Sequence, residues 1–139
     1  MKITETEVTV DLVVEYKERI LLIKRGNPPQ QGSWALPGGF VETDETVVAA
    51  AARELQEETG LATPGESLHF IGYFDDPQRD PRGRVISFAF GVELSEDFQP
   101  KAGDNANAVS WVPLYKLPGL AFDHEEILKT WKLNKLGGG

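Results

Sequence analysis

The chain has 139 residues, and its 14 Lys and Arg against 22 Asp and Glu give a formal net charge of −8. This excess of carboxylates argues against non-specific binding to nucleic acid or anionic membranes, which depends on clustered Lys and Arg. A hydrophobic share of 40% is typical of a globular domain, and the absence of cysteine excludes disulfides, thiolate metal sites and a cysteine nucleophile.

The first part of the chain predicts a β-hairpin, a loop and a short apolar segment. Residues 8–16 form a β-branched run that favours a buried strand, and residues 20–24 resume the apolar pattern after a polar turn. Residues 25–33 contain two glycines and two prolines, which predicts a loop. The apolar segment at residues 34–36 is ended by Pro-Gly-Gly at 37–39, where we expect the backbone to turn sharply and to expose carbonyl groups.

The strongest helix signal covers residues 46–59. Thr46 is suited to the N-cap, and the four consecutive alanines at residues 49–52 have the highest helix propensity of any residue. Gly60 is suited to the position that ends a helix in a left-handed conformation. A helix over 46–59 is therefore predicted.

The second half predicts strands, a loop and a last helix. The strands are expected at residues 68–74, 84–92 and 108–112, with a charged, proline-containing loop at 75–83 that we expect to face solvent. The last helix is predicted to begin at Asp123, with Glu126 completing a capping box, and to run to about Lys135.

This order of strands and helices indicates one mixed α/β domain. We expect it to cover residues 1–136, with the three glycines at 137–139 as a flexible tail. The N-terminal residues lack the apolar core of a signal peptide, and no apolar run approaches the roughly 20 residues of a membrane span. A cytoplasmic protein is therefore expected.

Three glutamates gather in the last turns of the helix predicted over 46–59. At roughly 100° per residue, Glu57 and Glu58 lie on either side of Glu54, within one arc of about 100°. These charges repel one another and lie at the negative end of the helix dipole. A hard divalent cation such as Mg²⁺ or Mn²⁺ would offset the repulsion. The alternative is a solvated acidic face without a ligand.

The stretch from residue 39 to 61 resembles the Nudix box at every specified position. It consists of GFVETDE (39–45), seven residues, and RELQEETGL (53–61), and the preceding WALPG (34–38) is also typical of Nudix hydrolases. The resemblance implies an α/β/α sandwich in which a mixed, partly antiparallel sheet lies between helices. It also implies an enzyme that uses Mg²⁺ or Mn²⁺ to hydrolyse a nucleoside diphosphate linked to another group.

The same resemblance assigns roles to the box residues. Arg53 would hold a glutamate in place through an ion pair, and Glu45 would support the loop before the helix. The implied metal ligands are three glutamates and a backbone carbonyl: Glu54, Glu57, Glu58, and Gly38 or Gly39.

The resemblance leaves the general base open, because family members use either a box glutamate or an acid from a later loop. Glu54 or Glu57 would serve in the first case, and Asp104 is the candidate in the second. Asp104 is interpreted equally well as an ordinary turn residue.

Candidate substrate-binding residues lie outside the box. The loop over 75–84 carries Arg79 and Arg82, whose forked guanidinium groups suit phosphate oxygens. Arg25 and Trp34, from the segments before the box, are the other candidates. The alternative for the loop arginines is pairing with the neighbouring aspartates, and the alternative for Trp34 is core packing.

Within the family, the loop after the box is similar to that of ADP-ribose pyrophosphatases, which tend to carry a proline about sixteen residues beyond the box. Pro77 stands sixteen residues after Leu61. The segment LAFDHEEIL (120–128) also resembles these enzymes and related ADP-ribose-sensing regulators. His124 in this segment is interpreted as a packing or capping residue in preference to a catalytic base.

Three functions follow, in order of preference. The first is hydrolysis of ADP-ribose to AMP and ribose 5-phosphate, and the second is a Nudix reaction on a modified nucleoside triphosphate or another nucleotide sugar. The third is a non-catalytic module that senses ADP-ribose, which would need a DNA-binding domain and tends to lose box glutamates. The expected partner is a small nucleotide, with neither nucleic acid nor membrane. A homodimer is one expected assembly, because many relatives pair.

Overall fold

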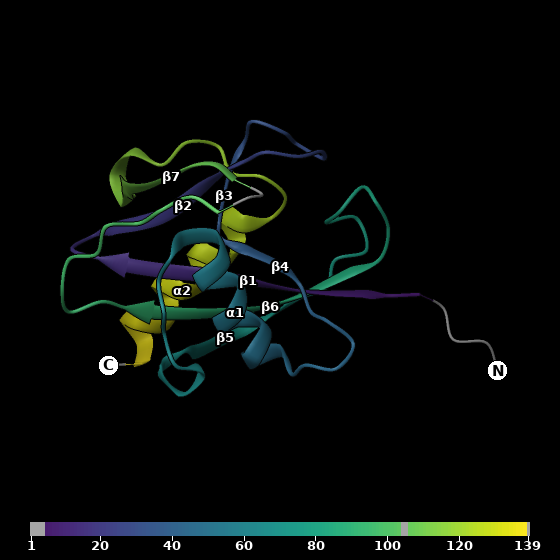
Figure 1. Ribbon diagram of the computed structural model, residues 1–139, viewed down its shortest axis with the longest axis horizontal. Helices are drawn as coiled ribbons and strands as arrows, with labels where there is room; N and C mark the ends of the chain where they lie inside the picture. Colours follow the sequence, from purple (N-terminus) through teal and green to yellow (C-terminus); the bar gives the residue numbers. More distant parts are fainter. Residues whose placement is uncertain (1–4, 104–105, 139) are drawn as a thin grey trace.

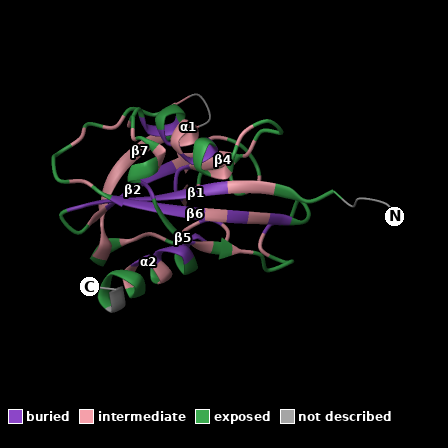
Figure 2. Ribbon diagram, turned by 90° about the horizontal axis from the view of Figure 1, so that it is seen from below, coloured by how far each residue is buried: buried purple, intermediate pink, exposed green. Residues whose placement is uncertain are grey.

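The computed structural model describes residues 5–103 and 106–138 as a sheet with one helix on each face (Figures 1 and 2). The helices are α1 (Val47–Thr59) and α2 (His124–Gly138), with single 3₁₀ turns at Gly65–Ser67 and Leu114–Lys116. In the described residues, neither helix has the length and apolar character needed to cross a membrane. The strands are β1 (Glu7–Tyr16), β2 (Arg19–Arg25), β3 (Trp34–Ala35), β4 (Gly38–Phe40), β5 (His69–Phe74), β6 (Val85–Glu93) and β7 (Ala106–Pro113).

The sheet is mixed. Its strand order is β3-β2-β1-β6-β5, with β7 paired to β2 and β4 paired to β1. Strands β1 and β6 are parallel along their length, whereas the other strand pairs are antiparallel. Because α1 and α2 cover opposite faces of this sheet (Figure 2), the predicted α/β/α sandwich with a mixed, partly antiparallel sheet is confirmed.

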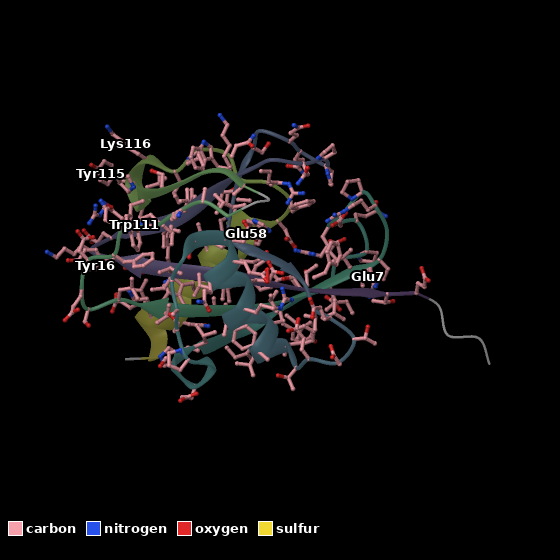
Figure 3. All side chains as sticks on the ribbon, in the orientation of Figure 1. Glu7, Tyr16, Glu58, Trp111, Tyr115 and Lys116 are labelled. Atoms are coloured by element: carbon pink, nitrogen blue, oxygen red, sulfur yellow. The ribbon has the colours of Figure 1, made fainter. Side chains whose placement is uncertain are left out.

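The predicted hairpin is also confirmed. Strands β1 and β2 are joined through Lys17 and Glu18, which have left-handed φ values of 48° and 59°. A two-residue turn of this kind matches the right-handed twist of the strands that it connects. Just before the turn, Tyr16 packs on Trp111 of β7 with 6.1 Å between ring centres, at the end of the sheet away from Glu58 (Figure 3).

Alternation along β1 builds a core on each face of the sheet. Leu12 and Val14 pack in the cluster under α1, whereas Val13 packs in the cluster under α2. By the same alternation Asp11 and Glu15 lie on the face toward α2, and both are buried. The central strand therefore places two carboxylates beneath α2.

Glu15 connects the sheet to α2. Its Oε1 accepts a hydrogen bond from the indole N–H of Trp131 at 2.9 Å and lies 3.0 Å from the Nζ of Lys135. Lys135 also pairs with Glu93 of β6 at 2.6 Å. This network satisfies the buried Glu15 and fixes α2 across β1 and β6.

Helix α1 begins and ends as its sequence predicts. The Oγ1 of Thr46 accepts a hydrogen bond from the N–H of Ala49 at 3.2 Å. Gly60 has a φ of 84°, and its N–H donates to the carbonyl of Gln56 at 2.8 Å. A residue with a Cβ adopts this left-handed conformation only with strain.

The segment before α1 differs from the expected sharp turn. Gly38–Phe40 is the short strand β4, which pairs antiparallel with β1 so that Gly38 lies opposite Asp11. A Cβ on Gly38 would lie 2.7 Å from Oδ1 of Asp11 and would overlap with the carbonyl of Val10. The glycine therefore serves close packing on β1, which the sequence pattern of a turn does not reveal.

The loop over 75–83 and the start of α2 also differ from expectation. The loop is not wholly exposed to solvent, because the side chains of Arg79 and Asp80 are buried. The predicted capping box of Asp123 and Glu126 is absent from the described hydrogen bonds, since the carboxylate of Asp123 is taken by Arg79. Helix α2 also runs through Gly138, where a tail was predicted from residue 137. Glycine weakens a helix without the steric clash of proline, so it does not force the end; residue 139 lies outside the described residues.

Candidate active site

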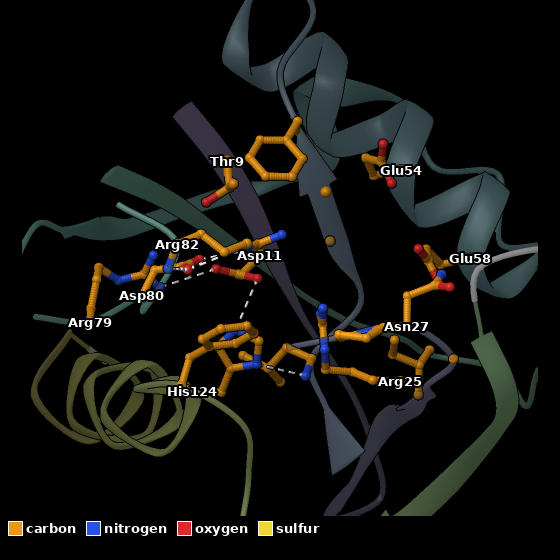
Figure 4. Close-up of a pocket in the computed structure, with 18 of the residues that line it drawn as sticks. Thr9, Asp11, Arg25, Asn27, Glu54, Glu58, Arg79, Asp80, Arg82 and His124 are labelled. Carbon is orange, nitrogen blue, oxygen red and sulfur yellow. Dashed lines mark hydrogen bonds and ion pairs between the residues drawn. The ribbon is translucent and has the colours of Figure 1, made fainter. Parts of the chain in front are cut away.

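A pocket of about 480 Å³ is lined by residues of β1, β2, β4 and α1, by the 75–84 loop and by the start of α2. Figure 4 shows Glu54 and Glu58 on one side, which we call the acidic wall. Arg79 and Arg82 lie on the opposite side, which we call the basic wall. The pocket therefore presents opposite charges across one space.

Glu58 is the most constrained carboxylate of the acidic wall. The residue is 6% exposed, and its Oε2 is the one buried side-chain nitrogen or oxygen in the described part of the chain without a hydrogen-bond partner. Burial and the charges of Glu54 and Glu57 raise the pKa of Glu58 to about 7, against the opposing charge of Arg25. Burial likewise raises the pKa of Glu54 above its ordinary value, although hydrogen bonds from Arg53 oppose the shift. The fold thus holds carboxylates whose charge it does not fully compensate.

Arg53, for which the resemblance implies an ion pair with a glutamate, contacts several carboxylates of the acidic cluster. Its Nη2 lies 2.5 Å from Glu45 Oε1, and its Nη1 donates to Glu54 Oε1 at 2.7 Å. The same Nη1 donates to both oxygens of Glu57 at 3.2 Å, while Nη2 also reaches the carbonyl of Phe40 at 3.0 Å. Hydrogen bonding to Glu45, ahead of the opposing effect of burial, raises the pKa of Arg53 further above its ordinary value. The guanidinium therefore connects the loop before α1 to the helix itself.

Glu45 supports that loop in a second way. Its Oε1 accepts a hydrogen bond from the N–H of Glu42 at 2.9 Å. Hydrogen bonds from Arg53 and from this N–H lower the pKa of Glu45. The supporting role implied for Glu45 is consistent with these contacts.

The backbone at Gly39 lies directly against the acidic wall. A Cβ at this position would overlap with the carboxyl group of Glu54, with Oε1 only 2.6 Å away. Glycine is required for this close approach. The strand β4 therefore brings the backbone of Gly38 and Gly39, both of which line the pocket, next to the carboxylates of α1.

These donors fit a hard divalent cation in their chemistry. Carboxylate and carbonyl oxygens are the ligands that Mg²⁺ and Mn²⁺ prefer, and the unpartnered Oε2 of buried Glu58 is a site for positive charge. Among residues 5–103 and 106–138, however, no three acidic or histidine side chains form a closed metal cluster. In this structure Arg53 pairs with the carboxylates of both Glu54 and Glu57.

Besides Arg53, three arginines line the pocket. Arg82 pairs with the buried Asp80 at 2.8 Å and lies over the ring of Phe40, 5.1 Å from its centre. Arg25 lies 5.0 Å from the ring centre of Phe122, and burial together with the charge of Arg82 lowers its pKa. The third, Arg79, is held by two hydrogen bonds to Asp123.

His124, the first residue of α2, lines the pocket. Its Nδ1 accepts a hydrogen bond from the N–H of Leu36 at 3.0 Å, and its Nε2 lies 3.2 Å from Oδ1 of Asp11. The N–H of Leu36 requires a lone pair on Nδ1, so the proton of the imidazole lies on Nε2, facing Asp11. Because both nitrogens are engaged, His124 has a packing role and is not available as a general base.

Asp11 is the partner that sequence reasoning missed. The hydroxyl of Ser87 donates a short hydrogen bond to its Oδ2. Burial opposes its charge, but interactions with His124 and Ser87 and the charge of Arg79 outweigh burial and lower the pKa of Asp11. A lone carboxylate inside the β-branched run of residues 8–14 was the available signal, because such a group is rarely buried without partners.

The remaining candidates are distributed differently. Glu57 is 57% exposed beside the pocket and contacts Arg53. Trp34 does not line the pocket and packs instead against the cluster under α2. Asp104 lies outside the described residues. Thus Arg25, Arg79 and Arg82 are brought together with the box residues, and Trp34 is not.

The chain matches the NUDIX domain family over residues 5–131. It is 48% identical over 130 residues to an ADP-ribose pyrophosphatase of Methanocaldococcus jannaschii, covering 94% of this chain and 75% of that protein. Its fold superposes on the NUDIX domain of Shewanella oneidensis NrtR complexed with ADP ribose, with a TM-score of 0.85, 27% identity, and coverage of 95% and 90%.

A second solved structure is a bifunctional NMN adenylyltransferase/ADP ribose pyrophosphatase from Francisella tularensis, complexed with AMP and a Mn ion. It has a TM-score of 0.81 and 33% identity. The match covers 99% of this chain but only 44% of that larger protein.

Proposed function

Because the chain belongs to the Nudix family and is a Nudix pyrophosphohydrolase, we propose that it hydrolyses ADP-ribose to AMP and ribose 5-phosphate. The observation that carries this proposal is the pocket with an acidic wall on α1 and a basic wall opposite (Figure 4). A diphosphate is held well in such a space, because a divalent cation binds one side of it and guanidinium groups the other. The identity of 48% to an ADP-ribose pyrophosphatase supports the choice of substrate.

The proposed cofactor is Mg²⁺, with Mn²⁺ as a substitute. Its proposed ligands are the side chains of Glu54, Glu57 and Glu58 and a backbone carbonyl of Gly38 or Gly39. When bound, such a cation neutralises the diphosphate and lowers the pKa of a coordinated water. The Mn ion in the Francisella tularensis structure supports a divalent cation in this fold.

Residues of the protein position the proposed metal ligands. Arg53 fixes the positions of Glu54 and Glu57 through Nη1, while its Nη2 binds Glu45. Gly39 allows the backbone to lie against the Glu54 carboxyl group. We assign the general base to Glu54 or Glu57, with Asp104 as the candidate from the later loop. Arg25, Arg79 and Arg82 are proposed to bind the substrate.

A hydrolysis screen with Mg²⁺ tests this function. Wild-type protein is incubated with ADP-ribose, dinucleotides and nucleoside triphosphates, and the products are separated by ion-exchange chromatography. We expect AMP and ribose 5-phosphate from ADP-ribose in equal amounts. Negligible turnover of ADP-ribose beside rapid turnover of a triphosphate would sink the proposal, and tight binding of ADP-ribose without any turnover would indicate a sensing module.

Matched variants identify the residues responsible. Glu57→Gln should reduce turnover by orders of magnitude and leave the circular dichroism spectrum unchanged, because it removes a proposed metal ligand without changing the shape of the side chain. Glu66→Gln, an exposed position in the 3₁₀ turn after α1, should keep full activity. Activity of Glu57→Gln within a few-fold of wild type would contradict the metal assignment.

Assembly and location complete the proposal. We infer a homodimer, which is supported by the exposed aromatic side chains of Phe70 and Tyr73 on the edge strand β5. Light scattering distinguishes it from a 15.3 kDa monomer. We place the enzyme in the cytoplasm, where nucleotides and Mg²⁺ are both abundant, and fractionation of cells with an antibody to the protein tests this.

A further inference from the structure

Arg79 is a buried arginine in a loop. Its side chain is 4% exposed although it belongs to the connection between β5 and β6. Arginine is almost never fully buried unless it is paired. Burial opposes its charge, but hydrogen bonds to Asp123 and the charges of Asp11, Asp123 and Asp80 outweigh burial and raise its pKa. The guanidinium is therefore a fixed positive charge at the edge of the pocket.

One edge of this guanidinium is occupied by Asp123. Its Nε donates to Asp123 Oδ2 at 2.9 Å, and its Nη2 donates to Asp123 Oδ1 at 2.7 Å. Nη1 makes no hydrogen bond to any residue that the structure describes. Because the paired edge is held in bidentate geometry, the direction of the Nη1 edge is fixed as well. Arg79 lines the pocket, and its Nη1 retains N–H donors that no described residue accepts.

Asp11 does not compete for that edge. It is the next carboxylate, with Oδ2 at 3.8 Å from Nη2 of Arg79, which is beyond hydrogen-bond distance. Its oxygens are already engaged by Ser87 and by His124. Asp123 therefore binds the guanidinium of Arg79. The carboxylate of Asp11 instead has its partners in Ser87 of β6 and His124 of α2.

Because its carboxylate binds Arg79, Asp123 does not cap α2 with its side chain. It immediately precedes the first residue of α2, where an aspartate normally accepts a hydrogen bond from the backbone of the first turn. Its backbone carbonyl accepts the N–H of Glu126 at 2.9 Å, but both carboxylate oxygens point to Arg79, 44 residues earlier in the chain. If Asp123 stabilised only the helix, its side chain would accept a hydrogen bond from the first turn of α2. Its pairing with Arg79 therefore indicates a role in the loop.

We propose that Asp123 is a positioning residue that holds the guanidinium of Arg79 so that its free Nη1 edge binds a phosphate oxygen of the substrate, across the pocket from the acidic wall. This inference rests on the proposed function, because it deepens the binding role given there to Arg79. The inference adds that Asp123, just before α2, orients Arg79 of the β5–β6 loop toward the diphosphate.

Steady-state kinetics of Asp123→Asn test the proposal. The variant keeps the shape of the side chain but loses the charge that pairs with both nitrogens. We expect KM for ADP-ribose to rise about tenfold and kcat to stay within about threefold, because the lost interaction binds ground state and transition state alike. Glu126→Gln is the matched control, since it removes an exposed carboxylate from the same turn of α2, where Glu126 pairs with Lys129, and it should leave KM unchanged.

A double-mutant cycle separates positioning from a structural role. Arg79→Ala should raise KM by at least as much as Asp123→Asn, and the Arg79→Ala, Asp123→Asn double variant should be no worse than Arg79→Ala alone. Additive effects on KM would overturn the proposal. So would a fall in melting temperature and in the active fraction of Asp123→Asn with an unchanged KM. If Asp123→Asn does not fold, Arg79→Lys serves instead. This variant keeps the positive charge but loses the forked guanidinium group, so it should show the same rise in KM. An unchanged KM would contradict the proposal.

Failure of the proposed function is distinguishable from failure of this inference. If wild type does not hydrolyse ADP-ribose, the proposed function fails, and the same variants are compared on whichever nucleotide of the screen is hydrolysed, because the phosphate is common to all. If wild type hydrolyses ADP-ribose and Asp123→Asn has the wild-type KM, only the inference fails. A chain that neither binds nor hydrolyses any nucleotide of the screen overturns both.

Discussion

Replacing Glu58 by glutamine removes a carboxylate that the fold buries without a full set of partners. In the folded protein without metal, the pKa of Glu58 is raised from 4.5 to about 7. Each pKa unit corresponds to about 1.4 kcal/mol, so the shift is worth up to about 3 kcal/mol of unfolding free energy. The folded state binds the proton more tightly than the unfolded state. Stability from this group is therefore fully present below pH 4.5 and is lost as the pH rises through 7.

Urea unfolding in EDTA between pH 5 and pH 8 measures this effect. The wild-type free energy of unfolding should fall by about 2–3 kcal/mol more than that of Glu58→Gln over this range. At pH 8 the variant should therefore be the more stable protein. Glu66→Gln, which removes an exposed carboxylate, is the control and should follow the wild-type curve.

The order of stability should reverse when Mg²⁺ is added. Wild type gains stability by mass action because the cation binds the folded state, whereas Glu58→Gln has lost a proposed ligand. A variant that is less stable than wild type at pH 8 in EDTA, or that has the wild-type pH dependence, would refute the reasoning about an uncompensated carboxylate.

Three further substitutions test other parts of the structure. Gly39→Ala places a Cβ on the Glu54 carboxyl group, so kcat with Mg²⁺ should fall at least about tenfold; an unchanged kcat would contradict the close approach. Trp131→Phe removes the N–H donor to buried Glu15 and should cost about 1–3 kcal/mol in urea unfolding; a cost near zero would show that the bond does not fix α2. Thr46→Ala should cost about 1 kcal/mol in the same assay through loss of the N-cap, and no cost would count against that cap.

Much of the fold was predictable because its signals are local. The β-branched run of β1, the alanine run of α1 and its capping residues Thr46 and Gly60 each specify their element within a few residues of sequence. The short strand β4 was missed because glycine is read as a turn residue. Its extended conformation depends on β1, to which it pairs, and this partner is distant in sequence.

In the candidate site, too, the residues that are close in sequence were predictable, whereas the contacts between distant segments were not. Glu54, Glu57 and Glu58 lie on one helix, so helical spacing predicted that they would gather, whereas the ion pair of Arg53 with a glutamate was implied by the resemblance to the Nudix box. The network beneath the basic wall joins Asp11, Arg79 and Asp123 from three separate segments. Asp123 was interpreted as a helix cap because its nearest neighbours in sequence favour that role. Its observed partner, Arg79 of the β5–β6 loop, lies 44 residues earlier in the chain.

A crystal structure of Glu57→Gln with ADP-ribose and Mg²⁺ tests the account most directly. We predict the diphosphate between the two walls, with Mg²⁺ on the side of Glu54 and Glu58 and a phosphate oxygen on the Nη1 edge of Arg79. ADP-ribose bound outside this pocket, or a diphosphate that contacts neither wall, would contradict the account.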